Sequence, residues 1–194
     1  MVIDKLISVG GLCEGFAFAE LLGKRVHGPV DNVAAKNFRS LINLFNGKLF
    51  NDILNDNVTK EELNMYRKYY SSDEEFLKTH DDFNLRYYDD WRSGHINFLI
   101  SKRKEEIKKR IDIFNKYNDE VKSGKENLYY LYTISEFEDT LTKEDFEYTY
   151  NNLPKYVIKN LIIFGANRNS IPEIFKNKFK YIQTNFGFDN KFWN

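Results

Sequence analysis

The stretch Lys5-Leu-Ile-Ser-Val-Gly-Gly11 decides the fold that this sequence predicts. Its first five residues form a short, mostly apolar run that is typical of a buried strand, and the two glycines end it. Apolar side chains then recur at helical spacing from Leu12 to Gly23, so a helix follows the strand almost directly. Cys13 falls at this strand-turn-helix boundary.

Working outward, the same kinds of segment alternate along the rest of the chain. Short strands are expected at Leu128–Ile134, Leu161–Gly165 and Lys180–Thr184. Helices are expected at Phe38–Leu54, Ile96–Val121 and Asp145–Lys159, with Pro154 breaking the last one. Short apolar strands separated by helices predict a three-layer α/β domain, in which a mainly parallel sheet is flanked by helices. The three runs Leu6–Val9, Leu128–Thr133 and Leu161–Phe164 should be neighbours in it.

The chain of 194 residues is expected to form a single domain, residues 1–194. The segment Lys24–Asn32 contains Gly28 and Pro29 and is expected to be a loop. Residues 55–91 are polar and rich in tyrosine, and we interpret them as a mostly helical or irregular insertion that could act as a lid.

The composition excludes several classes of protein. Lys and Arg number 29, as do Asp and Glu, so no overall field attracts nucleic acid or an acidic membrane surface. The chain has one Cys, which cannot form an internal disulfide or a Cys-rich zinc site. No run of about 18 apolar residues predicts a membrane span, and we expect no leader peptide. A cytoplasmic protein without a cofactor is therefore expected.

Cys13 is the strongest candidate for chemistry. A Cys in the first turn of a helix lies near unpaired backbone N–H groups and the positive end of the helix dipole, which favour the reactive thiolate. Gly10 and Gly11 allow a sharp turn and the close approach of a substrate. The alternative is that Cys13 is a small buried apolar residue, as many free cysteines are.

A Cys nucleophile usually needs a base, and the chain has three histidines. His80 lies beside Asp81 and Asp82, His95 precedes the long helix, and His27 lies in the loop that follows the Cys helix. Each is also compatible with a surface role. Compact metal-ligand spacing occurs at His80-Asp81-Asp82 alone, and we expect no metal site.

Two further features concern charge. Arg103 and Arg110 share a helical stripe with Ile107 and Phe114, so at least one guanidinium should point inward, toward a carboxylate or an anionic substrate group. Asp31 follows Pro29 and is equally compatible with a turn or a helix cap.

Six segments of the chain form a recognisable set: Ile7-Ser-Val-Gly-Gly-Leu-Cys13, Gly28-Pro-Val-Asp-Asn32, the helix through Leu44-Phe45, His80-Asp-Asp-Phe83, the basic helix from Arg103 to Phe114, and Leu128-Tyr-Tyr-Leu131. Together these segments resemble a family of bacterial papain-like cysteine peptidases of unknown function. Val30 stands where that family has phenylalanine, and Asp82 is an extra residue within the histidine-aspartate-phenylalanine pattern. The resemblance spans roughly residues 6 to 135.

The resemblance implies a catalytic set of Cys13 as nucleophile, His80 as base and Asp31 as the residue that orients the base. Contacts with a small-molecule or peptide substrate are expected from Gly10, Gly11, Asn32, Arg103 and Arg110. We therefore expect a cysteine-dependent hydrolase or acyl-transferase. The alternative is a non-catalytic protein that binds a phosphate or carboxylate at the same helix N-terminus.

Overall fold

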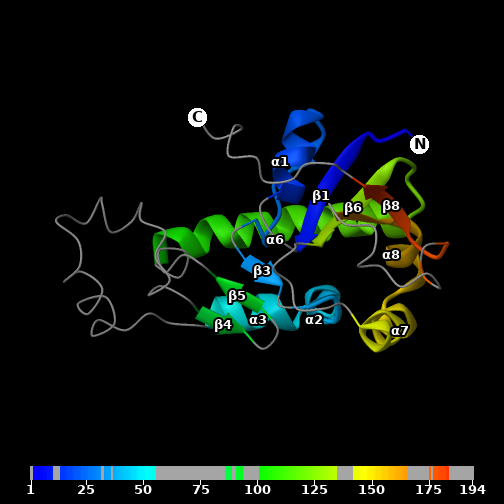
Figure 1. The fold of residues 1–194 in the computed structure, drawn as a ribbon. Helices are drawn as coiled ribbons and strands as arrows, with labels where there is room; N and C mark the ends of the chain where they lie inside the picture. Colours follow the sequence, from blue (N-terminus) through cyan, green and yellow to red (C-terminus); the bar gives the residue numbers. More distant parts are fainter. Residues whose placement is uncertain are drawn as a thin grey trace, which may run out of the picture.

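The main sheet of the protein contains five parallel strands in the order β2-β1-β6-β7-β8 (Figure 1). The computed structural model describes residues 2–10, 14–31, 33–35, 37–55, 86–88, 91–93, 101–134, 142–165, 175 and 177–183. The strands are β1 (Lys5–Gly10), β2 (Arg25–Val26), β6 (Leu128–Ile134), β7 (Leu161–Gly165) and β8 (Lys180–Gln183). The predicted parallel arrangement of the three apolar runs is confirmed.

Helices cover both faces of this sheet, as the predicted three-layer architecture requires. On one face, α1 (Glu14–Leu21) packs on β1, β2 and β6, where Ala19 meets Leu6 and Leu131. The opposite face carries α2 (Ser40–Phe45), α3 (Lys48–Asn55), α6 (Ser101–Lys122), α7 (Lys143–Asn152) and α8 (Lys155–Asn160). Among the described helices, none combines the length and apolar character needed to cross a membrane.

The strand order has a direct consequence for function. Numbered as they occur along the chain, the five strands lie in the order 2-1-3-4-5, so the direction of strand addition reverses between β1 and β6. The connections leaving these two strands then run to opposite faces of the sheet. In open α/β sheets, ligands bind outside the carboxyl ends of the strands at such a switch point. The segment that follows β1 is therefore the segment of interest.

The expected single helix over Phe38–Leu54 is wrong, because the chain forms α2 and α3 there. The break lies at Gly47, which has a φ of 79°, a conformation that residues with a Cβ rarely adopt. Asn46 Oδ1 accepts a hydrogen bond from the backbone N–H of Lys48 at 2.9 Å and so caps the start of α3. The expected break at Pro154 is confirmed, since Pro154 separates α7 from α8.

Strands also occur where the sequence predicted none. β2 lies within the expected loop Lys24–Asn32, and it pairs with β1 through Leu6 and Ile7. A second, antiparallel sheet has the order β3-β5-β4 and consists of β3 (Val33–Ala35), β5 (Trp91–Ser93) and β4 (Arg86–Tyr88). β3 contacts β1, beside whose carboxyl end it lies in Figure 1. Most of the expected insertion, residues 55–91, lies outside the described residues.

Candidate functional site

The carboxyl end of β1 departs from regular strand geometry. Between Ser8 and Gly10 the register with β6 shifts, and Gly10 pairs with Tyr132. Gly10 has a φ of 142°, which favours glycine at this position. The next three residues, 11–13, lie outside the described residues, and α1 begins at Glu14. The predicted nucleophile, Cys13, is the residue directly before α1 in the sequence.

The first turn of α1 lies against the carboxyl end of β6. A Cβ built on Gly15 would be 2.2 Å from Thr133 Oγ1, a distance that two atoms cannot share. Gly15 therefore permits a close approach of the helix backbone to the sheet. Thr133 is buried, and its hydroxyl has no hydrogen-bond partner among the described residues. The helix that follows Cys13 starts directly over the switch point.

The chain leaving β2 passes equally close to β1. A Cβ on Gly28 would meet Ile7 Cγ1 at 3.1 Å and the backbone oxygen of Ser8 at 3.3 Å. Gly28, Pro29 and Val30 are buried. Asp31 directly follows this tightly packed segment. The packing of the segment on β1 therefore restricts the position of the Asp31 backbone.

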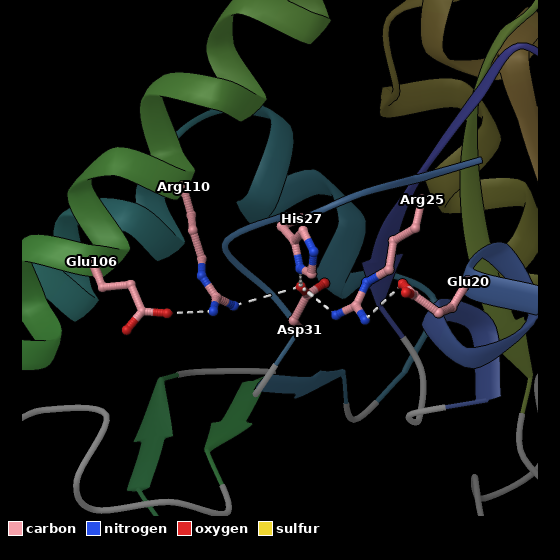
Figure 2. Close-up of polar contacts among 6 residues, drawn as sticks. All are labelled: Glu20, Arg25, His27, Asp31, Glu106 and Arg110. Atoms are coloured by element: carbon pink, nitrogen blue, oxygen red, sulfur yellow. Dashed lines mark hydrogen bonds and ion pairs between the residues drawn. The ribbon is translucent and has the colours of Figure 1, made fainter. Parts of the chain in front are cut away.

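Asp31 is the centre of an ionic cluster (Figure 2). Its Oδ2 accepts a hydrogen bond from Arg25 Nη2 at 3.0 Å, and it lies 3.5 Å from Arg110 Nη1 and 3.6 Å from His27 Nδ1. The exposed fraction of the side chain is 3% for Asp31, 18% for Arg25, 21% for Arg110 and 59% for His27. A buried carboxylate is thus held between two mostly buried guanidiniums, beneath a histidine that reaches solvent.

Two outer carboxylates extend the cluster in opposite directions. Glu20 of α1 accepts a hydrogen bond from Arg25 at 3.3 Å, and Glu106 of α6 accepts one from Arg110 at 2.5 Å. Because α1 and α6 cover opposite faces of the sheet, the cluster connects the two helical layers around the edge strand β2. The expectation that Arg103 or Arg110 points inward, toward a carboxylate, is confirmed for Arg110.

Within this cluster, one oxygen of Asp31 stands out. Oδ1 is buried and has no hydrogen-bond partner among the described residues, whereas Oδ2 faces three nitrogen atoms. Buried carboxylate oxygens in folded proteins normally accept hydrogen bonds. The carboxylate therefore retains capacity for one further donor.

The orientation of His27 was not anticipated from the sequence. Its Nδ1 lies 3.6 Å from Asp31 Oδ2, so the opposite ring nitrogen, Nε2, points away from the carboxylate. A base oriented by a third group is the arrangement found in nucleophilic enzymes. One feature of the sequence could have predicted this contact. His27 and Asp31 are four residues apart, and the turn through Gly28-Pro29 between them brings the two side chains together.

The remaining predicted site residues are described in part or not at all. Cys13, His80, Gly11 and Asn32 lie outside the described residues, and so does the side chain of Arg103. Gly10 ends β1, and Asp31 and Arg110 contact each other in the ionic cluster. In the part of the chain that the structure describes, no group of three His, Cys, Asp or Glu side chains is arranged to hold a metal ion.

No family model, curated protein or solved structure matches the chain. The resemblance to papain-like cysteine peptidases stays a prediction based on the motifs quoted above.

Proposed function

We propose that the chain is a cysteine-dependent hydrolase or acyl-transferase, peptidase-like in its chemistry, with Cys13 as its nucleophile. The observation that carries this proposal is the strand order. The connection containing Cys13 leaves β1 at the switch point between β1 and β6, and it leads within three residues into a helix packed on Thr133. Ligands bind at this location in open α/β sheets, and a helix N-terminus there favours a thiolate.

The proposed reaction follows the general scheme of thiol acyl transfer. The Cys13 sulfur attacks a substrate carbonyl while a histidine takes the thiol proton, and backbone N–H groups of Gly11 and Cys13 stabilise the oxyanion. Collapse of the intermediate breaks the bond to the leaving group, which receives the proton. Water or an acceptor nucleophile then attacks the thioester. By the family resemblance His80 is the base and Asp31 orients it, and Asn32 and Arg103 contact a small-molecule or peptide substrate.

The alternative, a non-catalytic protein that binds a phosphate or carboxylate, has less support. It draws on Arg110 as an anion-binding group, but Arg110 already faces the carboxylates of Asp31 and Glu106. An anionic ligand would have to compete with both. A reducing cytoplasm, in which a lone thiol stays reduced, suits the enzyme.

The pH dependence of alkylation tests the proposal, because the chain has a single Cys and the label reports one site. With the native protein and iodoacetamide, we expect rapid labelling well below pH ~8.5, the range of a free thiol. Incubation with activated esters should give a thioester on Cys13 that mass spectrometry detects. A thiol that reacts with iodoacetamide only after unfolding would overturn the proposal, because Cys13 would then be a packed core residue.

A further inference from the structure

We propose that Asn46, in the turn between α2 and α3, is a site of spontaneous covalent modification, at which water converts the side-chain amide to a carboxylate. The inference is independent of the proposed function, because it uses neither Cys13 nor the ionic cluster. Asn46-Gly47 is the one Asn-Gly pair in the sequence. Glycine has no Cβ to shield its backbone nitrogen, so this nitrogen reaches the side chain of a preceding asparagine more easily than that of any other residue.

The reaction begins at the backbone nitrogen of Gly47, which gives its proton to water and attacks Asn46 Cγ. A C–N bond forms, and Oδ1 takes up the electron pair of the carbonyl. Collapse of this intermediate breaks the bond to Nδ2, which takes up a proton and leaves as ammonia. The product is a five-membered succinimide ring. Water then adds to one of its two carbonyls and breaks the C–N bond there, which gives either aspartate or isoaspartate.

The first support is the open surroundings of the turn. Asn46 is exposed, and a Cβ built on Gly47 would meet nothing within 4 Å. The Gly47 N–H donates to the backbone oxygen of Leu44 at 3.2 Å, and the attack requires this hydrogen bond to open. It also requires Asn46 to rotate from its ψ of 0°. Because no side chain packs on Gly47 at this side, the rotation displaces no buried group.

The second support is the position of the side-chain oxygen. Asn46 Oδ1 accepts a hydrogen bond from the backbone N–H of Lys48 at 2.9 Å, which closes a ring that includes the peptide between Asn46 and Gly47. The side chain is thereby folded toward Gly47. The same N–H is a fixed donor for the oxygen on which negative charge develops during the attack, as in an oxyanion hole.

The two products differ in their effect on the fold. Aspartate keeps an acceptor for the Lys48 N–H and places a negative charge at the amino end of α3, where the helix dipole favours it. Isoaspartate carries the backbone through the former side chain, which adds one methylene between α2 and α3. Leu44 of α2 and Leu49 of α3 are buried in the same core, and the two helices contact each other. The added length therefore disturbs their packing and destabilises the protein.

Peptide mass spectrometry of native protein held at pH 8 and 37 °C for several weeks tests the proposal. Two asparagines without a following glycine serve as internal controls. Asn127 also lies in a turn and precedes Leu128, and Asn51 is exposed on α3. We expect Asn46 to convert about tenfold or more faster than either control. An Asn46 amide that persists as long as the controls in native protein, but converts in the urea-unfolded chain, would overturn the inference, because the fold would then protect the turn.

A thermal melt tests the consequence. Asn46→Ser keeps an oxygen that caps α3 but has no amide to lose, so its Tm should stay constant during the incubation. The isoaspartate form of the parent, separated by chromatography, should melt about 2 °C or more below the unmodified protein, and the aspartate form should not. If Asn46→Ser does not fold, the mass spectra of the parent decide alone. An isoaspartate form with the parent Tm would contradict the effect on the packing of α2 and α3.

Discussion

The contact between α1 and β6 gives a prediction whose sign depends on one interatomic distance. Gly15 lies in the first turn of α1, where alanine is ordinarily the better helix former by about 0.5–1 kcal/mol. Helix propensity alone therefore predicts that Gly15→Ala stabilises the protein. The structure predicts the opposite, because the new Cβ would lie 2.2 Å from Thr133 Oγ1, an atom of a buried side chain.

The size of the destabilisation by Gly15→Ala depends on how far the Thr133 side chain or the α1 backbone must shift to accept the new Cβ. Overpacking in a well-packed region costs about 1–3 kcal/mol, and the gain in helix propensity offsets part of it. We expect a net loss of about 1–2 kcal/mol, which corresponds to roughly 2–8 °C in Tm for a chain of this size. Thr133→Ala removes the clashing oxygen and leaves Leu131 Cδ2 as the nearest remaining side-chain neighbour outside residue 133, at 3.6 Å. In that background Gly15→Ala should stabilise by about 0.5–1 kcal/mol.

Urea denaturation of the parent, both single variants and the double variant measures this coupling. The expected coupling free energy is about 2 kcal/mol. Gly15→Ala should lower the free energy of unfolding in the parent and raise it in the Thr133→Ala background. If Gly15→Ala stabilised the parent as much as it stabilises Thr133→Ala, the close approach of α1 to β6 would be refuted. The proposal for Cys13 would then rest on the strand order without the packing of α1 on β6.

Two further predictions concern α6. Burial raises the pKa of the Tyr117 hydroxyl above its ordinary value of 10, and this hydroxyl donates to the backbone oxygens of Lys5 and Tyr129. The stability that this neutral hydroxyl contributes is present below pH 10 and is lost as the pH rises toward the folded-state pKa. Tyr117→Phe should therefore lower the free energy of unfolding by about 1–2 kcal/mol at pH 7 and by less above pH 10. Urea denaturation at each pH measures this difference. Arg110→Met removes one of two guanidiniums from Asp31 and should cost about 1–3 kcal/mol. Glu106→Gln, at a more exposed pair, should cost less than about 1 kcal/mol, and equal losses in the two variants would contradict the central place of Asp31.

The sequence predicted those parts of the fold that depend on local apolar pattern. Leu128–Ile134 and Leu161–Gly165 are strands as expected, since a short apolar run between helices is typical of a buried strand in a parallel sheet. The break between α2 and α3 was missed because apolar spacing stays in phase across Asn46 and Gly47, and spacing carries no information on φ. β2 was missed because its two residues, Arg25 and Val26, are too few to show any pattern.

The candidate site was predictable to a lesser degree. Arg110 was expected to face inward because it shares a stripe with Ile107 and Phe114. The periodicity of a single helix was sufficient for that prediction. The contact between His27 and Asp31 needed the chain after β2 to fold tightly over β1, which depends on Gly28 meeting Ile7. The convergence of Arg25 and Arg110 on one oxygen depends on the tertiary structure, because the two arginines come from elements that are far apart in the sequence. Local sequence patterns could not predict it.

The cost of the Asp31 cluster is itself an argument about function. Moving a carboxylate and two guanidiniums out of water costs several kcal/mol per ion, and apolar residues of similar volume often replace such groups without loss of stability. The sequence keeps them beside β1, which contacts both β2 and β3, and Val30, Ala35 and Phe38 are buried nearby along the chain. A purely structural link between α1 and α6 would not require a buried carboxylate with an exposed histidine set against it. The retained contact between His27 and Asp31 therefore supports the proposed enzyme.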